Sequence, residues 1–109
     1  MKAKFEIVIL KEAEKFLEEL DESVRKKVIY NIDKSRFVND PKLLKKLTGD
    51  IWEFRTKYQN QQYRLFAFWD KRDKTETLVI STHGMIKKVS KVPKSEIAKA
   101  TRIMQQYLD

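Results

Sequence analysis

The chain has 109 residues, with 24 Lys or Arg against 16 Asp or Glu, so its formal net charge is +8. This length fits one compact domain, 1–109, and 41% hydrophobic residues are typical of a folded, soluble protein. The absence of cysteine excludes disulfides, a zinc ribbon and a thiol nucleophile, and a lone histidine excludes a multi-histidine metal site. We therefore expect no metal and no cofactor. Without a long apolar run or a signal-peptide pattern, the sequence predicts a cytoplasmic protein and no membrane partner.

The positive charge is confined to one part of the chain. Residues 1–40 carry nine basic and nine acidic side chains, whereas residues 41–109 carry fifteen basic and seven acidic ones, which accounts for the whole excess. This asymmetry favours a densely negative partner, with nucleic acid first and an anionic membrane surface second. A lysine-rich surface that only keeps the protein soluble would give the same totals. The positions of the charges therefore have to distinguish a binding surface from a solubilising one.

The first half of the chain predicts a strand followed by two helices. Residues 4–10 begin with alternation and then become wholly apolar, which is typical of a strand inside a sheet. Residues 11–20, and then a segment that starts at the candidate N-cap Asp21, show helical spacing of apolar side chains, which predicts an antiparallel helix pair. Asp40-Pro41 predicts one or two further helical turns through Leu47, before Gly49-Asp50 breaks the chain. The two apolar stripes are Ala13, Phe16, Leu17 and Leu20, and Val24, Val28, Ile32 and Phe37.

The second half is strand-like until a final helix. Residues 51–58 and 62–69 predict two antiparallel strands joined by a short turn at 59–61. A polar turn at 70–74 leads to a third strand over about residues 76–83, and a helix starts near Pro93. The order β-α-α-β-β-β-α indicates an α+β domain in which a helix hairpin packs on a mostly antiparallel sheet. The stripe of the last helix is Ile97, Ala100, Met104 and Leu108.

Three cations in the strand region indicate an anion site. The period of two places Arg55 and Lys57 on one face of their strand, away from its aromatic residues. If Arg64 of the next strand faces the same side, two guanidiniums converge on one sheet surface. Glu53 can neutralise one of these cations but not all three. A sheet gains nothing from burying unpaired arginine, so the pattern favours a binding surface over an ion-pair cluster.

The segment from His83 to Lys91 is the second candidate region. Gly84 permits an irregular backbone after the third strand, and Lys87, Lys88 and Lys91 crowd the approach to the last helix. On the pattern alone, His83 is as compatible with a hydrogen-bonded histidine at a strand end as with a functional one. A serine-hydrolase dyad with Ser81 is disfavoured because no carboxylate or oxyanion motif accompanies it.

Three segments taken in order carry a resemblance to a known family. Residues 51–58 (IWEFRTKY), 62–66 (QYRLF) and 83–88 (HGMIKK) resemble the motif series of phage-derived HigB-type toxins, which belong to the RelE/ParE superfamily of type II toxin–antitoxin systems. The similarity extends through nearly the whole chain. Two departures are Met85, where an aromatic residue is usual, and Val92, where a Thr or Ser cap is common.

The resemblance implies a RelE-like fold and a ribosome-dependent endoribonuclease that cuts translated mRNA. It also implies a small helix-turn-helix antitoxin, HigA-like, that silences the toxin and forms an oligomer with it. Such an enzyme can work without metal if the 2′-OH of the RNA attacks the adjacent phosphate. The reaction then needs cations around the developing charge, a base for the 2′-OH and an acid for the leaving oxygen.

The chemistry of the side chains suggests their roles in such a reaction. Arg55 and Arg64 suit phosphate clamping because a guanidinium binds two oxygens in a fixed fork. Lysines hold the RNA backbone, and one with a depressed pKa could be the base. His83 has the best intrinsic pKa for the acid. Tyr63 is the candidate for stacking on a base, with Tyr58, Phe66 and Trp69 as further choices. The lysines are Lys57, Lys87 and Lys88, with Lys91 as a further contact to RNA or the ribosome.

Two other functions stay open at this point. A ParE-like toxin would keep the fold but poison gyrase through protein contacts. A non-catalytic nucleic-acid module would use the basic face only to bind the backbone, with an affinity that falls steeply with salt.

Overall fold

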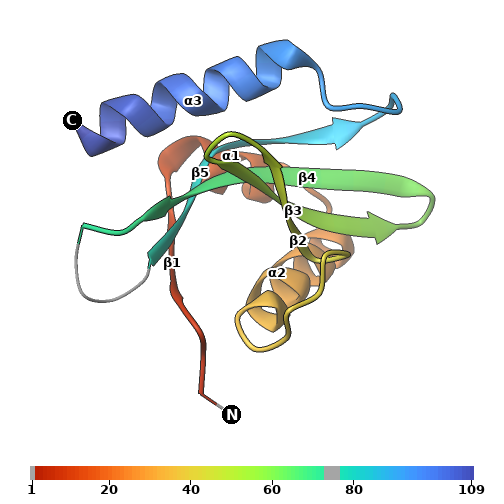
Figure 1. Cartoon of the computed structure of the whole chain (residues 1–109). Helices are drawn as coiled ribbons and strands as arrows, with labels where there is room; N and C mark the ends of the chain where they lie inside the picture. Colours follow the sequence, from red (N-terminus) through yellow and green to blue (C-terminus); the bar gives the residue numbers. More distant parts are fainter. Residues whose placement is uncertain (1, 73–76) are drawn as a thin grey trace.

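The computed structural model describes the backbone of residues 2–72 and 77–109, and the side chains of residues 2–72 and 83–109. Residues 73–74 of the polar turn predicted at 70–74, and residue 76 at the predicted start of the third strand, lie outside the described residues. The elements follow in the order β1 (Glu6–Ile9), α1 (Lys11–Glu18), α2 (Glu22–Ser35), β2 (Leu44–Thr48), β3 (Ile51–Tyr58), β4 (Gln61–Asp70), β5 (Thr77–Lys87) and α3 (Lys94–Leu108) (Figure 1).

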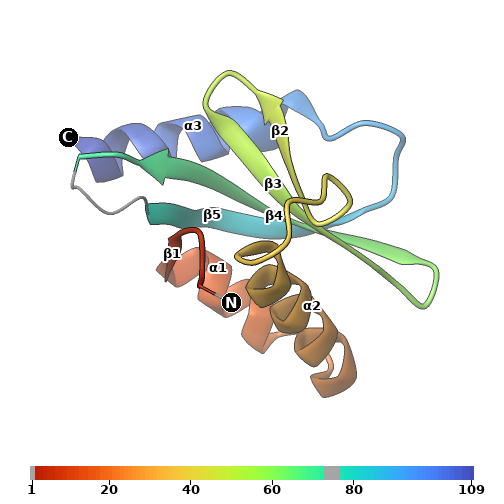
Figure 2. The ribbon, with the colours of Figure 1, turned by 60° about the horizontal axis from the view of Figure 1, so that its bottom comes forward.

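One sheet between two helical layers forms the architecture. Its strand order is β1-β5-β4-β3-β2, with β1 parallel to β5 and the other neighbours antiparallel. The helices α1 and α2 cover one face and α3 covers the other (Figure 2). The predicted α+β class, with a helix pair on a mostly antiparallel sheet, is confirmed. In the described part of the chain, no helix is long and apolar enough to cross a membrane.

The central strand β4 separates two hydrophobic cores. Leu65 and Ala67 point into the core formed with α1 and α2, whereas Phe66 and Phe68 pack with Ala100 of α3. All four β4 side chains are at most 1% exposed. A strand buried on both faces is apolar at every position rather than at every second one, which explains the continuous run in this part of the sequence.

Residues 44–48 form strand β2, so the predicted short helix is wrong. The backbone makes a single turn after Asp40, whose carbonyl accepts the N–H groups of Leu43 at 2.9 Å and Leu44 at 3.1 Å. From Leu44 the chain pairs with β3, and Gly49, at φ 55°, forms the turn between the two strands. One helical turn is weak by itself. Pairing with a long neighbouring strand therefore decides the structure here.

The first strand lies at the edge of the sheet, not inside it as its apolar run predicts. β1 pairs only with β5 among the described strands, and Val8 and Ile9 are 38% and 41% exposed. The period of a short apolar segment does not distinguish an edge strand from a central one.

Strand β5 runs further than predicted. It continues through Gly84 to Lys87, so that Met85 pairs with Arg64 and Lys87 pairs with Gln62 of β4. A register irregularity between Leu65 and Ala67 accommodates the change of spacing. Lys87 therefore lies on the sheet instead of in a loop.

Gly84 is a point of close packing between β5 and α1. A Cβ at this position would overlap the ring of Phe16. We expect Gly84→Ala to lower the free energy of unfolding by about 1–3 kcal/mol, because the ring must shift. Urea unfolding measures this loss. In a Phe16→Ala background the same substitution should cost far less, and an equal cost in both backgrounds would contradict the contact.

Candidate functional site

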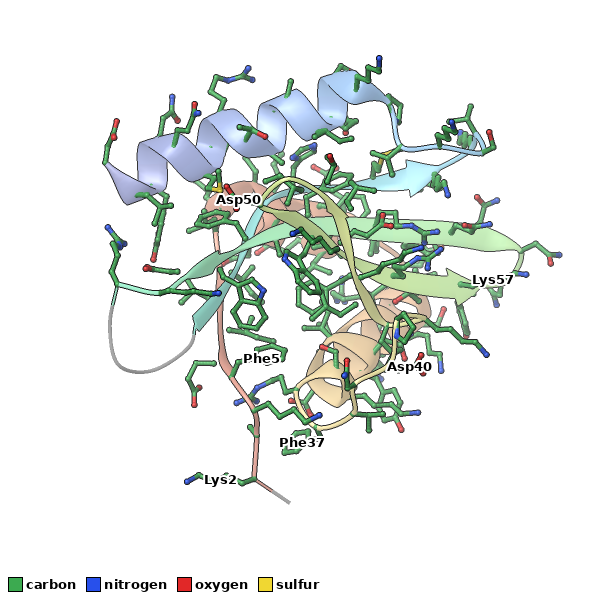
Figure 3. All side chains as sticks on the ribbon, in the orientation of Figure 1. Lys2, Phe5, Phe37, Asp40, Asp50 and Lys57 are labelled. Carbon is green, nitrogen blue, oxygen red and sulfur yellow. The ribbon has the colours of Figure 1, made fainter. Side chains whose placement is uncertain are left out.

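The two predicted arginines meet on one face of the sheet. Arg55 of β3 and Arg64 of β4 are directly paired in the antiparallel register, so their side chains project to the same side. Lys57 follows on the same face, toward the tip of the β3–β4 hairpin (Figure 3). These side chains, with Lys42 and Gln62, line a hollow of about 290 Å³. The sequence left open whether Arg64 faces the same side as Arg55, and the structure shows that it does.

Glu53 lies beneath the two arginines. Its carboxylate is 3.2 Å from Nε of Arg64 and 3.7 Å from Nε of Arg55. Glu53 is 5% exposed and Arg64 is 2% exposed, whereas Arg55 reaches further toward solvent. Burial lowers the pKa of the Arg64 guanidinium, the charge of Glu53 raises it and that of Arg55 lowers it. The carboxylate therefore makes a buried arginine tolerable and holds the second one beside it.

In the described part of the chain, the hydrogen bonds of the two arginines leave one buried N–H group on each of them unpaired. Arg64 donates to Oε1 of Gln62 at 2.7 Å and to the carbonyl of Tyr63 at 3.2 Å, and Arg55 donates to the carbonyl of Pro41 at 3.3 Å. Within the described residues, however, Nε of Arg55 and Nε of Arg64 have no hydrogen-bond partner. The short contact of Arg64 with Glu53 is thus an ion pair whose N–H is not aligned with the oxygen.

Lys87 completes the site from β5. Partial burial is the largest effect that lowers the pKa of its ammonium group, and the charges of Arg64, Arg55 and Lys45 act in the same direction. Glu53 opposes them. The sequence placed Lys87 among three equivalent lysines. The structure distinguishes it because β5 continues past Gly84 and brings it opposite Gln62.

We call this set of residues the cation cluster. It comprises six basic side chains around one carboxylate, so it carries a local positive excess in a partly dry environment. Guanidiniums that line one hollow suit the oxygens of a phosphate, because each binds two oxygens in a fixed fork. Among the described side chains of residues 2–72 and 83–109, no group of three or more His, Asp or Glu is placed to hold a metal ion. The members are Lys42, Lys45, Arg55, Lys57, Arg64 and Lys87 around Glu53.

His83 lies in a different environment from the cation cluster. Its Nε2 is 2.9 Å from Oε2 of Glu96 on α3, and its ring packs 5.0 Å from that of Phe66. It lines a separate hollow with Glu12 and Lys99, not the one that contains Arg64. Burial lowers the pKa of His83 more than Glu96 raises it. The expected role of His83 as acid beside the arginines is therefore corrected to a link between β5 and α3.

Tyr63 also needs a correction. It is 6% exposed and belongs to the core against α1 and α2, on the face opposite the arginines. Its ring is therefore not available for stacking on RNA. Lys88 and Lys91 are exposed and lie beyond the end of β5, as the sequence indicated.

The fold and the cation cluster define a small α+β protein with a group of basic side chains on one face of its sheet. The model of the family described as phage derived protein Gp49-like (DUF891) matches residues 15–105. The chain belongs to this phage-derived family, a toxin-like family related to RelE/ParE-type toxins. Comparison with curated proteins and with solved structures gives no match.

Glu53 offers a direct test of the cation cluster. We expect Glu53→Gln to lower the free energy of unfolding by about 3–5 kcal/mol at low salt, because the buried arginines lose their counter-charge. Inorganic phosphate should restore more stability than chloride at equal ionic strength. Thermal and urea unfolding measure both effects. Glu6→Gln, which removes an exposed partner of Arg36, is the matched control and should change little. Equal losses in both variants would contradict the site.

The His83–Glu96 contact predicts how stability depends on pH. Because the folded pKa of His83 lies below its ordinary value of 6.5, its contribution is complete above that pH and is lost as the pH falls through the folded value. His83 is the chain's one histidine, so urea unfolding between pH 5.5 and 8 isolates its titration. His83→Gln should flatten this dependence, and an unchanged slope would exclude the assignment.

Proposed function

We propose that this protein is the toxin of a type II toxin–antitoxin system, of the HigB branch, and that it cuts mRNA on the ribosome. The observation that carries the proposal is the cation cluster, in which two arginines that line one hollow stand beside a lysine of lowered pKa. A surface that only binds nucleic acid needs exposed cations but no partly buried lysine whose pKa is lowered by burial and by neighbouring cations. Membership of a toxin-like, phage-derived family supports the same proposal.

The reaction follows from the chemistry of the cluster. Neutral Lys87 takes the proton of the ribose 2′-OH, and the 2′ oxygen forms a bond to the adjacent phosphorus. Arg55 and Arg64 hold the non-bridging oxygens and stabilise the added negative charge. The bond from phosphorus to the 5′ oxygen then breaks, and that oxygen takes a proton. The products are a 2′,3′-cyclic phosphate and a 5′-hydroxyl end.

The acid and the binding residues are assigned from their positions. Lys57, which lines the same hollow and is exposed, takes the place of His83 as the proposed donor to the leaving oxygen. Lys42 and Lys45 bind the flanking phosphates, and Lys88 and Lys91 extend the positive surface toward the ribosome. Glu53 does not touch RNA in this scheme. It positions the two arginines.

A neutralising partner is part of the proposal. A toxin that arrests translation requires an antitoxin, which we propose to be a small helix-turn-helix protein that forms a complex with this chain. Its acidic residues would be drawn to the same positive surface that binds RNA.

The activity can be tested with translating ribosomes in a reconstituted system. We expect wild-type protein to cut mRNA within the codon in the ribosomal A site. Lys87→Arg should reduce cleavage by about 10²–10⁴-fold, because a guanidinium stays protonated and does not act as a base at neutral pH. Lys34→Arg on α2, remote from the cluster, is the matched control and should cleave normally.

The other outcomes separate the remaining functions. Inhibition of gyrase supercoiling without RNA cleavage would select the ParE-like function. RNA binding that weakens steeply with salt, without cleavage, would select a passive nucleic-acid module. Normal cleavage by Lys87→Arg would overturn the assignment of the base.

A further inference from the structure

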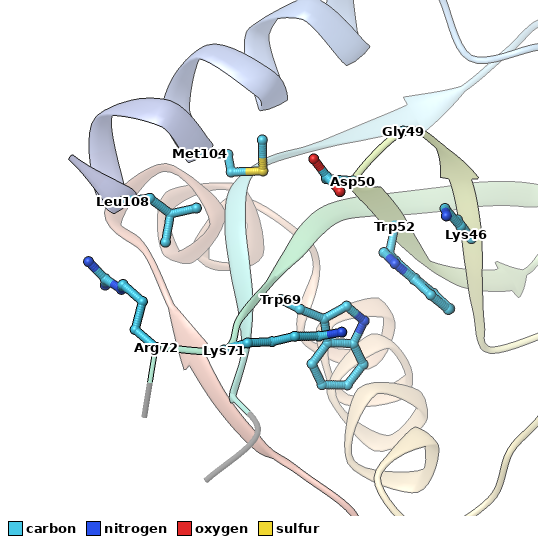
Figure 4. A pocket seen from close by; sticks show the side chains of 9 residues that line it. All are labelled: Lys46, Gly49, Asp50, Trp52, Trp69, Lys71, Arg72, Met104 and Leu108. Atoms are coloured by element: carbon cyan, nitrogen blue, oxygen red, sulfur yellow. The ribbon is translucent and has the colours of Figure 1, made fainter. Parts of the chain in front are cut away.

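A second hollow of about 670 Å³ lies away from the cation cluster, and both tryptophans of the chain line it. In Figure 4, Trp52 and Trp69 stand side by side in this hollow, with Asp50 at the β2–β3 turn above them. Lys46 is on one side, and Lys71 and Arg72 are on the other (Figure 4). We call it the tryptophan hollow. Its volume falls in the range of small-ligand sites.

The hollow exists because β4 is longer than β3. The last described pair between the two strands is Trp52 with Ala67, while Phe68 to Asp70 continue to pair with β5. Along their other edge, these last residues of β4 have no strand partner among the residues that the structure describes. Met104 and Leu108 of α3 close the far side.

The indoles are held in fixed positions. Trp52 and Trp69 meet edge to face with their ring centroids 6.2 Å apart, and Phe5 meets Trp69 edge to face at 5.0 Å. Both indoles remain partly exposed. Rigid, partly exposed aromatic rings are what a protein needs to stack an unpaired base, because little entropy is lost on binding.

The rim of the hollow is cationic. Lys46 pairs with Trp52 across β2 and β3, and Lys71 follows the end of β4; both are exposed. Arg72 is already fixed, by two hydrogen bonds to Asp70 at 2.8 and 2.9 Å. Lys46 and Lys71 are therefore the cations placed to meet a ligand. Among the described lining residues, Asp50 is the one acidic side chain.

Strand β2 connects the tryptophan hollow to the cation cluster. Lys45 pairs with Glu53 and Lys46 pairs with Trp52, so consecutive residues of this edge strand project to opposite faces. Lys45 contributes to the cation cluster and Lys46 contributes to the hollow. A nucleic-acid backbone that crosses this edge of the sheet therefore meets positive charge on both faces, from Lys45 on one and from Lys46 on the other.

We propose that the tryptophan hollow binds an unpaired base of single-stranded RNA, which stacks on the indoles while Lys46 and Lys71 contact the neighbouring phosphates. This inference rests on RNA as the ligand of the proposed function, but it assigns a separate binding site. An extended peptide could instead pair with the free edge of β4. That edge is only three residues long, and indoles rimmed by lysines match a base and its phosphates better than a peptide backbone.

The two tryptophans make the test direct, because the chain's whole indole fluorescence arises from this hollow. The probe is a six-nucleotide, 2′-O-methylated single-stranded RNA, which cannot be cleaved through its 2′ oxygen. We expect saturable quenching of the emission at low salt. Lys46→Ala/Lys71→Ala should weaken binding by about tenfold, through loss of two phosphate contacts. Lys34→Ala/Lys94→Ala removes the same charge at remote exposed sites and should bind as wild type does.

A second variant keeps the test independent of the lysines. Trp52→Leu retains Trp69 as the reporter and should weaken binding by about 5- to 150-fold, the range for loss of one stacked base. Quenching that is unaffected by all of these variants, or an acidic peptide that quenches where the RNA does not, would overturn the proposal.

The outcome is separable from that of the proposed function. Lys87→Arg keeps a basic side chain in the cluster and changes no residue that lines the tryptophan hollow, so it should quench normally even when it fails to cleave. Normal quenching by wild-type protein that cuts no mRNA would support the hollow and reject the nuclease. Cleavage by a protein whose fluorescence does not respond to the RNA would reject the hollow alone.

Discussion

The enclosure of β4 on both faces is the constraint on which the rest of the structure depends. Its apolar residues supply both cores, but Arg64 occurs within the same strand and is only 2% exposed. A buried guanidinium requires a partner, and Glu53 of β3 provides it at 3.2 Å. That ion pair fixes β3 against β4 and places Arg55 directly opposite Arg64. Two like charges so placed would repel each other without the carboxylate.

The same arrangement explains how stability and function are linked. Glu53 offsets part of the positive charge, and the remaining cations of the cluster still repel one another. This repulsion and partial burial together lower the pKa of Lys87. A bound phosphate would neutralise part of this charge and relieve the repulsion. The cations that destabilise the free protein are therefore the ones through which a bound phosphate would stabilise the folded state. The repulsion that weakens the free fold therefore comes from the same cations to which the proposed function assigns the RNA backbone.

The edge strand β2 extends the proposed RNA-binding surface from one face of the sheet to the other. Because side chains alternate along a strand, Lys45 and Lys46 reach opposite faces from adjacent positions. One face carries the cation cluster and the other carries the indoles. Edge strands commonly carry lysine as a guard against unwanted pairing. Here the same lysines connect two sites on opposite faces of the sheet.

Local periodicity was enough to predict the α+β class, the two N-terminal helices and the last helix, because each depends on spacing within one segment. It also placed Arg55 and Arg64 on neighbouring strands joined by a short turn, where their convergence required only that they face the same side. It was not enough for β2, where pairing with β3 replaces a weak helical turn, nor for Lys87, whose position depends on how far β5 pairs with β4. His83 and Tyr63 were misplaced for the same reason: the side on which a strand residue is buried is set by the helix that packs there. The sequence by itself determined which residues could carry the chemistry. Only the tertiary structure decided which of them meet, because hydrogen-bond pairing and burial join segments that are distant in the chain.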